Sequence, residues 1–197
     1  MKHQVAVLGV LVLVSSCGET TTQPTPRNLR GDVTDPAGDT RSSPSGVAPD
    51  LRSGSIEINA ATNAMLISVR CAPGTFNSAT TIVQFDLDLD QNPATGSPFE
   101  GLGLEYIVNM GSPLNAGQAQ VFRFVGGAGT GYQLVNVPLP VTVVADGIDV
   151  SIPLSVIGND DGRMTFRVVT SVHLGGNTST GILDYMPDSG APAGVVQ

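Results

Sequence analysis

The residues best suited to chemistry in this 197-residue chain lie between Asp86 and Gly96, in the sequence Asp-Leu-Asp-Leu-Asp-Gln-Asn-Pro-Ala-Thr-Gly. Successive side chains of an extended strand point to opposite faces, so Asp86, Asp88 and Asp90 would share one face. Three like charges on one face repel one another unless water or a cation screens them. Oxygen ligands of this kind suit a hard cation, Ca²⁺ above all. The segment therefore predicts a calcium site whose ligands are Asp86, Asp88, Asp90, Asn92 and, from the following strand, Glu105.

An alternative interpretation needs no ion, because charge on a strand face also keeps an exposed sheet edge from pairing with another chain. The EF-hand is excluded, since its loop requires Gly at the sixth position and Glu at the twelfth. Counting from Asp86 places Gln91 and Ser97 there, and a count that starts two residues later fails in the same way. An ion held here would therefore draw its ligands from several loops.

Two further groups of acidic residues flank the central segment. Asp32, Asp35 and Asp39 lie near the start of the folded part, and Asp184 and Asp188 lie near the C-terminus. Asp-Pro and Asp-Ser-Gly sequences suit turns, because Asp accepts hydrogen bonds from nearby backbone groups. Taken one at a time, each group predicts a turn rather than a site.

The residue types on which most enzymes depend are scarce in this chain. After removal of an N-terminal leader, His173 is the only histidine and no lysine remains. The sequence has no Gly-x-Ser-x-Gly motif, no zinc-binding Cys/His spacing and no complete dinucleotide fingerprint. It therefore predicts a protein that is not an enzyme, with a glycosidase built on two carboxylates as the weaker alternative.

The N-terminal residues predict export and lipid anchoring. Residues 1–4 carry one positive charge, residues 5–14 are an apolar run, and two serines precede Cys17. Such a run is too short to span a bilayer and fits a signal peptide. The sequence Val-Ser-Ser-Cys17 resembles a bacterial lipobox, so we expect loss of residues 1–16 and lipidation of Cys17. An ordinary signal peptide that happens to contain a Cys is the alternative.

The rest of the chain divides into a tether and one domain. Residues 17–30 are polar and contain two prolines, which predicts a flexible tether, and residues 31–197 suit a single domain. We expect this domain in the bacterial cell envelope, at the outer membrane or cell surface, because Gly18 is not the Asp that favours inner-membrane retention. Without Lys2, eight Arg face seventeen Asp and Glu, so the net charge of −9 argues against a nucleic-acid or anionic-lipid partner.

Short and alternating apolar runs dominate the domain, and none has the period of a helix over a helical length. Asp146-Gly147 predicts a two-residue hairpin turn, and Cys71 shares an alternating face with Val69, which predicts a buried thiol. The pattern predicts an all-β fold, an antiparallel two-sheet β-sandwich of jelly-roll type with about nine strands. The predicted strands are residues 55–59, 65–71, 81–89, 105–110, 118–125, 132–135, 141–145, 148–153 and 164–172.

Several short motifs stand in order between residues 32 and 190: Asp35-Pro-Ala-Gly-Asp39, Ala48-Pro-Asp50-Leu, Phe85 to Gly96, Gly103-Leu-Glu105-Tyr106, Ile152-Pro-Leu-Ser and Asp184-Tyr-Met-Pro-Asp188-Ser-Gly190. This order resembles exported bacterial β-sandwich domains related to family 9 carbohydrate-binding modules and DOMON-like domains. The resemblance implies a jelly-roll-like sandwich with structural Ca²⁺ and, in some members, a ligand groove. Glu105 stands where that family has an Asp or Glu before a Tyr.

The aromatic residues depart from the sugar-binding pattern, which usually stacks sugars on Trp. The chain has no Trp, and its Phe residues fit the core, so Tyr106, Tyr132 and Tyr185 are the candidates for lining a ligand groove. We expect an extracytoplasmic binding module that is anchored to the membrane through Cys17, stabilised by Ca²⁺ and able to bind carbohydrate. The alternative is a structural or protein-interaction lipoprotein of the cell envelope without a small ligand.

Overall fold

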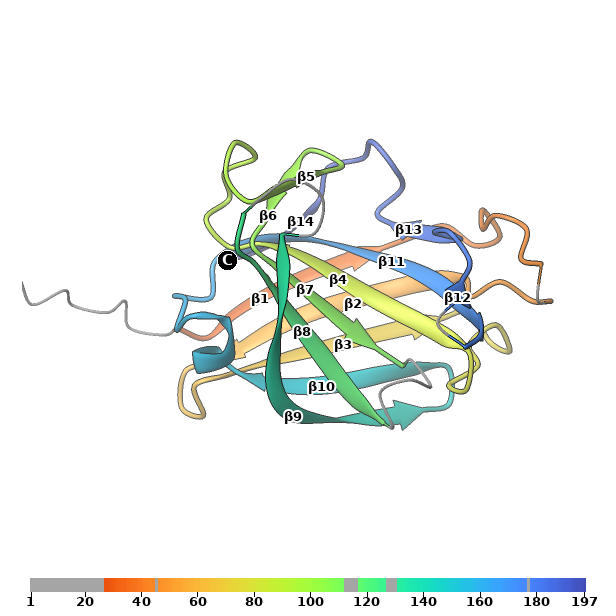
Figure 1. The fold of residues 1–197 in the computed structure, drawn as a ribbon, viewed down its shortest axis with the longest axis horizontal. Coiled ribbons are helices and arrows are strands. Elements are labelled where there is room, and N and C mark those ends of the chain that lie inside the picture. Colours follow the sequence, from red (N-terminus) through yellow and green to blue (C-terminus); the bar gives the residue numbers. More distant parts are fainter. Residues whose placement is uncertain (1–26, 45, 112–116, 127–130, 177) are drawn as a thin grey trace, which may run out of the picture.

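The computed structural model describes residues 27–44, 46–111, 117–126, 131–176 and 178–197, so the predicted signal peptide, Cys17 and most of the tether lie outside the described residues. Strands dominate this part of the chain, and the short 3-10 helix η2 (Leu154–Ile157) lies among them (Figure 1). None of the described residues belongs to a helix with the length and apolar character that crossing a membrane requires. The strands are β1 (Leu29–Thr34), β2 (Leu51–Asn59), β3 (Ala64–Cys71), β4 (Thr81–Asp88), β5 (Ser97–Phe99), β6 (Leu102–Leu104), β7 (Tyr106–Met110), β8 (Gln118–Phe124), β9 (Tyr132–Val144), β10 (Gly147–Pro153), β11 (Met164–Gly175), β12 (Thr178–Ser179), β13 (Asp184–Met186) and β14 (Gly194–Val196).

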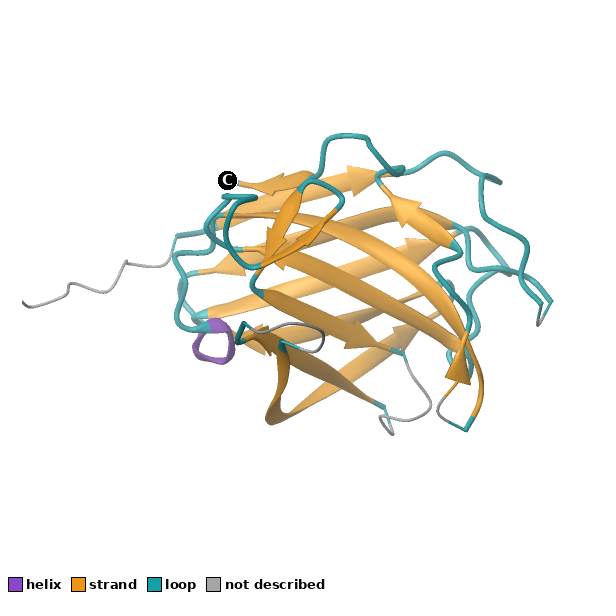
Figure 2. Cartoon of the chain, turned by 45° about the horizontal axis from the view of Figure 1, so that its top comes forward, coloured by secondary structure: helices purple, strands orange, loops and turns teal. Residues whose placement is uncertain are grey.

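Twelve of these strands form one antiparallel sheet that curls on itself (Figure 2). Its order is β1-β2-β3-β10-β9-β8-β7-β4-β11-β12, with β13 and β14 also paired to β11, while β5 and β6 form a separate hairpin. The two ends of the sheet meet, because the backbones of Arg30 in β1 and Gln197 beside β14 exchange hydrogen bonds of 3.4 and 3.3 Å. The predicted all-β antiparallel fold is confirmed, but the architecture is one curled sheet of twelve strands in place of two sheets with about nine.

The long strand β9 joins the part of the sheet that contains β10 to the part that contains β8. Pro138 and Pro140 break its apolar pattern, and the sequence therefore predicts two separate strands on either side of them. In the structure β9 is continuous, pairing with β8 as far as Pro140 and with β10 from Val141 onward. The prolines thus lie close to the point where the strand changes partner. The predicted hairpin between β9 and β10 is confirmed, but its two-residue turn is Ala145-Asp146, because Gly147 already belongs to β10 and pairs with Val144.

The sequence pattern does not predict the strands that close the sheet, of which β1 is the most instructive. The inward-facing positions of β1 are Leu29, Gly31 and Val33, so a glycine stands where the alternating pattern requires an apolar side chain. A Cβ on Gly31 would lie 2.6 Å from the carbonyl oxygen of Val195 in β14. Glycine is therefore needed where the two backbones approach each other, and this requirement removes the strand signal from the sequence.

The inner face of the curled sheet carries the hydrophobic core. Val83, Phe85 and Leu87 of β4 are fully buried, as their alternation predicts. The ring of Phe85 stacks on that of Phe166 in β11, with centroids 5.9 Å apart and an interplanar angle of 17°. Cys71 is also buried, and burial raises the pKa of its thiol to about 12, which agrees with the predicted structural role.

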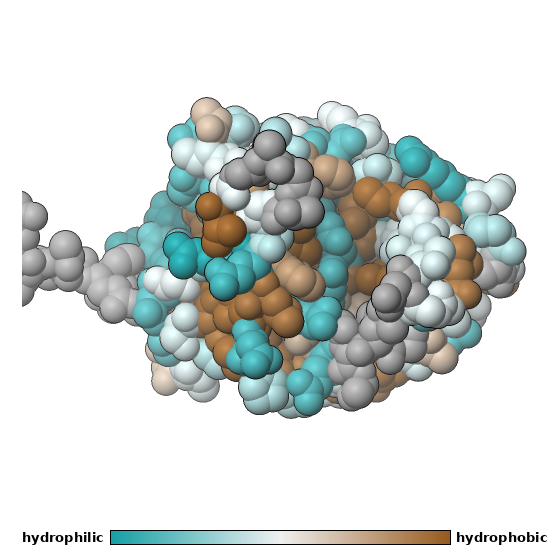
Figure 3. All heavy atoms as spheres, in the orientation of Figure 1, coloured by the Kyte–Doolittle hydropathy of each residue, from teal (hydrophilic) through white to brown (hydrophobic). Residues whose placement is uncertain are grey.

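The outer surface mixes polar and apolar side chains, and Figure 3 shows both kinds on the face seen in Figure 1. The exposed apolar residues include Leu134, Val137 and Val143 of β9. Single exposed apolar side chains are ordinary on soluble proteins, so they identify no site.

Candidate metal centre

The structure divides the acidic residues of the Asp86–Gly96 segment between two environments. Asp88, Asp90 and Glu105 come together, with one carboxylate oxygen of each within 4.8 Å of the others. Asp86 lies apart from this triad, at the position of β4 that pairs with Arg167 of β11. Asp86 and Asp88 are only 0% and 1% exposed, so the interpretation of a solvated charged face is wrong for these two residues.

The triad of Asp88, Asp90 and Glu105 is already supplied with hydrogen-bond donors. Four donors lie within 3.2 Å of its six carboxylate oxygens: the backbone N–H groups of Leu89, Asn92 and Gly103 and the hydroxyl of Thr95. The single hydroxyl proton of Thr95 is shared among Asp90, Glu105 and the carbonyl of Asn92, so the donors satisfy only part of the triad. The side-chain oxygen of Asn92 accepts the N–H of Ala94 and so completes the turn. These bonds hold the turn without an ion, and calcium binding by this segment stays a prediction.

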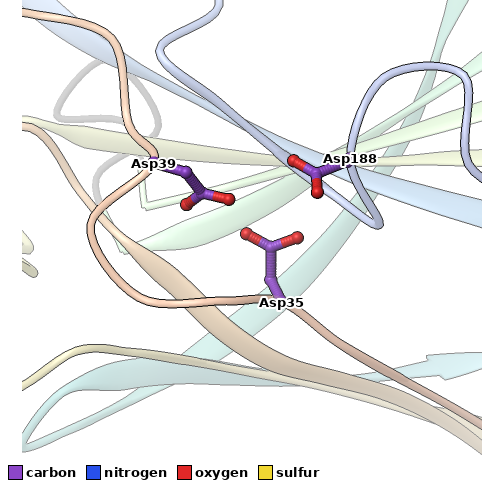
Figure 4. A group of neighbouring side chains, drawn as sticks. All are labelled: Asp35, Asp39 and Asp188. Carbon is purple, nitrogen blue, oxygen red and sulfur yellow. The ribbon is translucent and has the colours of Figure 1, made fainter.

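A larger acidic cluster forms where two segments distant in sequence meet, the loop between β1 and β2 and the segment of β13 with the loop after it. Asp35 and Asp39 come from the loop after β1, Asp50 precedes β2, and Asp184 and Asp188 belong to β13 and the loop that follows it. We refer to these five residues as the aspartate cluster. The carboxylates of Asp35, Asp39 and Asp188 point into a shared space (Figure 4). The structure thus joins the two terminal acidic groups, each of which the sequence predicts only as a turn.

Three members of the aspartate cluster are withdrawn from solvent. Asp35, Asp50 and Asp184 are 5%, 8% and 4% exposed. Both oxygens of Asp35 and the Oδ1 of Asp50 are buried without a hydrogen-bond partner. A buried polar group without a partner costs about 1–3 kcal/mol, and more if it is charged. The ion pairs found among the described residues involve Arg30 and Arg70, and they leave the cluster out.

The electrostatics of the aspartate cluster disfavour its own negative charge. Burial, followed by the charges of the four neighbouring carboxylates, raises the pKa of Asp35 to about 7. Burial also raises the pKa of Asp184 to about 6, although the N–H groups of Leu51 and Tyr185 donate to its oxygens and oppose the shift. A cation placed among these carboxylates would reverse this penalty, because an opposite charge favours the ionised form.

The spacing of the oxygens suits a calcium ion. Calcium takes six to eight oxygen ligands at about 2.3–2.6 Å, so two ligands of one ion lie at most about 5 Å apart. Asp35, Asp39 and Asp188 meet this condition at 4.8 Å, and so do Asp39, Asp50 and Asp184. The orphaned oxygens and the donor set therefore fit a hard divalent cation.

Hydrogen bonds between the segments hold the aspartate cluster in place. The N–H of Gly38 donates to Asp50 Oδ2 at 2.9 Å, and the N–H of Leu51 donates to Asp184 Oδ2 at 2.7 Å. The guanidinium of Arg167, a residue 1% exposed, donates to the backbone carbonyls of Pro187, Asp188 and Ala191 and so fixes the loop that carries Asp188. The cluster is thus held by the fold before any ligand arrives.

The three tyrosines predicted to line a groove lie in different places. Tyr106 is 6% exposed and packs in the core, where it is unavailable for stacking on a surface ligand. Tyr132 meets Phe124 edge-on with ring centroids 5.4 Å apart, and Tyr185 lies under the guanidinium of Arg41 at 5.4 Å. In the sheet, β8, β7, β4 and β11 separate the strand of Tyr132 from that of Tyr185.

Polar residues form a groove elsewhere, on the outer face of β1, β2 and β3. It has a volume of about 450 Å³, and Ser53, Ser55 and Ser68 are among its lining residues. Arg30 and Arg70 also line it, and they pair with Asp32 at 2.8 Å and Asp149 at 2.6 Å. No sequence motif indicates this groove, because its residues are ordinary for the outer face of a strand and only the pairing of three strands brings them together.

Comparison of the chain with protein-family models, with curated proteins and with solved structures finds no match in any of the three. The chemistry of the candidate site therefore rests on its geometry. A sequence signal for the aspartate cluster does exist: both terminal groups contain a pair of Asp four residues apart, Asp35 with Asp39 and Asp184 with Asp188.

Asp86 generates a prediction about pH. Its Oδ1 accepts a hydrogen bond from Gln84 Nε2 at 2.7 Å, and its buried Oδ2 has no partner. Burial raises the pKa of Asp86 to about 7, against the opposing effects of Gln84 and of the Arg167 charge. Because the folded protein holds this proton more tightly than the unfolded chain, the contribution of Asp86 to stability should fall as pH rises from about 4 to about 7 and stay level above that.

Replacing Asp86 with Asn keeps the acceptor for Gln84 and removes the buried charge. Asp86→Asn should therefore exceed the wild type in unfolding free energy at pH 8 by on the order of 1–3 kcal/mol, with a smaller difference at pH 4.5. Urea unfolding followed by circular dichroism across this pH range measures the effect, with the exposed Glu57→Gln as the matched charge control. A difference between Asp86→Asn and wild type that is the same at every pH would contradict the assignment.

Proposed function

We propose that this chain is an extracytoplasmic binding module of the bacterial cell envelope, anchored through lipidated Cys17 and stabilised by Ca²⁺ at the aspartate cluster. The observation that carries the proposal is the convergence of five Asp from two segments distant in sequence, with both oxygens of Asp35 buried and unpartnered. The same proposal includes a relationship to family 9 carbohydrate-binding modules and DOMON-like domains. It also describes the curled sheet as a jelly-roll-like sandwich.

The ligand set of the aspartate cluster favours Ca²⁺ over other common ions. The five side chains offer only carboxylate oxygens, whereas zinc prefers His and Cys. Magnesium keeps several waters and is usually bound through one or two carboxylates, while calcium accepts many protein oxygens in a flexible arrangement. The predicted extracytoplasmic location is also one in which weakly binding calcium modules operate.

Binding of Ca²⁺ at the aspartate cluster would stabilise the fold. Its ligands come from parts of the chain as far apart as Asp35 and Asp188, so the site does not exist in the unfolded protein. A ligand that binds only the folded state adds its binding free energy to stability. The bound ion would fix the loops at the end of the sheet where β1 and β14 meet.

The groove on β1, β2 and β3 is the place where a small ligand of the module would bind. Serine hydroxyls and paired charges donate and accept hydrogen bonds, which matches the hydroxyl groups of a carbohydrate. The separation of the three tyrosines favours this polar groove over a tyrosine platform. A structural or protein-interaction role for the same lipoprotein is the competing outcome.

Calcium removal tests the metal proposal. At a hundred times its dissociation constant, Ca²⁺ should add about 2.7 kcal/mol, which raises the melting temperature by about 5–10 °C relative to protein in chelator. Circular dichroism of the mature protein in detergent measures this shift, with Mg²⁺ as the comparison ion. An identical melting curve in calcium and in chelator would show that the aspartate cluster holds no exchangeable calcium.

Asp35→Asn sharpens this test, because its effect on the melting temperature should have opposite signs in chelator and in calcium. In chelator the variant should melt above the wild type, because it removes a buried charge that has no partner, a gain of about 1–2 kcal/mol. In calcium it should lose most of the metal-dependent shift, since it removes a ligand. Glu57→Gln removes an exposed charge outside the cluster and should leave the shift unchanged. A variant that melts below the wild type in chelator would contradict the electrostatic argument.

A glycan array probed with the mature protein in saturating Ca²⁺ tests the carbohydrate part of the proposal. Ser55→Tyr fills the groove and should abolish the binding of any glycan that the wild type retains. Ser155→Tyr adds the same side chain at an exposed position of η2 and should leave binding intact. If the wild type binds no glycan, the carbohydrate part fails and the protein-interaction alternative is favoured.

Replacement of Cys17 tests the anchor. Cys17→Ser removes the acceptor for lipid, so the protein should move from the membrane fraction to the soluble extracytoplasmic fraction. Labelling with a fatty-acid analogue should mark the wild type and not the variant. Retention of unlabelled Cys17→Ser in the membrane would show that something other than this residue holds the protein there.

A further inference from the structure

The aspartate cluster contains two overlapping triads. Asp35, Asp39 and Asp188 form one, and Asp39, Asp50 and Asp184 form the other, with the three oxygens of each triad within 4.8 Å of one another. Asp39 is common to both, while Asp35 and Asp188 belong to one side and Asp50 and Asp184 to the other. A carboxylate has two oxygens, so a shared Asp is able to bridge two neighbouring ions.

Each triad has its own oxygen that lacks a partner. Asp35 is 5% exposed and neither of its oxygens accepts a hydrogen bond. Asp50 is 8% exposed and its Oδ1 has no partner, although its Oδ2 accepts the N–H of Gly38. Buried oxygens without a partner therefore lie on both sides of Asp39. One ion on one side would leave the buried oxygen on the other side without a partner.

The charge of the aspartate cluster points the same way. Five ionised carboxylates carry five negative charges. One divalent cation beside Asp35 and Asp188 would leave three of these charges uncompensated, with the buried Asp50 and Asp184 on the side that has no ion. A second cation would leave one, which the exposed Asp39 and Asp188 can share with solvent. Buried charges are tolerated when they are paired or coordinate metals, so the second ion removes most of the remaining penalty.

We infer that the aspartate cluster binds two Ca²⁺ ions bridged by Asp39, one held with Asp35 and Asp188 and the other with Asp50 and Asp184. The inference rests on the proposed calcium function and adds the number of ions and the ligands of each. The two positions differ in exposure. Asp50 and Asp184 are both buried, whereas Asp39 and Asp188 are exposed, so the ion beside Asp188 has fewer protein ligands shielded from water and binds more weakly.

Stoichiometry of calcium binding to the mature protein in detergent tests this inference. Equilibrium dialysis with Ca²⁺ alone should give two ions per chain for the wild type, for the control Glu57→Gln and for Asp90→Asn. The last variant removes a ligand from the triad of Asp88, Asp90 and Glu105, so two ions in it show that neither ion lies in that triad. Asp188→Asn and Asp50→Asn should each reduce the number to one, and Asp39→Asn should weaken both ions at least tenfold. Asp188 is exposed, so this variant remains informative even if the buried Asp50→Asn fails to fold.

The outcomes separate the inference from the proposed function. One ion per wild-type chain would overturn the pair and leave calcium stabilisation standing. No bound ion would overturn the calcium function itself. Two ions retained by Asp188→Asn, or one ion of unchanged affinity retained by Asp39→Asn, would each overturn the assignment of ligands to the two positions. Two ions in the wild type that fall to one in Asp188→Asn would support it.

Discussion

The meeting of β1 with β14 is the contact on which the rest of this structure depends. It closes the curled sheet, and it works only because Gly31 lets the backbone of Val195 come close. The same closure brings the loop after β1 beside the loop after β13. Asp35 and Asp188 become neighbours for this reason, although they lie near opposite ends of the domain. Sheet geometry, rather than local sequence, therefore creates the aspartate cluster.

Closure gathers carboxylates that form no ion pair with an Arg among the described residues. The buried Arg167 lies beside the loop of Asp188, yet its guanidinium donates to three backbone carbonyls. Backbone N–H groups of Gly38 and Leu51 meet only part of the hydrogen-bonding capacity of Asp50 and Asp184. Arg167 thus fixes the geometry of the loop and leaves the charge of the carboxylates for a cation. In the triad of Asp88, Asp90 and Glu105, by contrast, three backbone N–H groups and the Thr95 hydroxyl donate to the carboxylates.

Local pattern predicts the interior of the sheet, and contacts distant in sequence decide the rest. The alternation of Val83, Phe85 and Leu87 foretells their burial, because it depends only on neighbours along one strand. The continuity of β9 across its prolines depends on a change of partner that no local window contains. The candidate site also depends on contacts distant in sequence. The Asp86–Gly96 segment has the highest local density of acidic residues, whereas the aspartate cluster combines residues from segments that each predict only a turn.

The aspartate cluster combines residues from both ends of the domain, so it forms only when the domain is fully folded. Leu51 and Asp184 are 133 positions apart and are joined by a backbone-to-carboxylate hydrogen bond, so the ligands converge only after the last strands have paired with β11. If the aspartate cluster binds calcium as proposed, partly folded chains would gain nothing from the ion, and the free energy of binding would stabilise the native state alone. Without an ion, repulsion among the carboxylates would act on that same state. Calcium bound there would therefore act on the closure of the sheet itself, beyond the C-terminal end of β1 and opposite the end that the predicted tether enters.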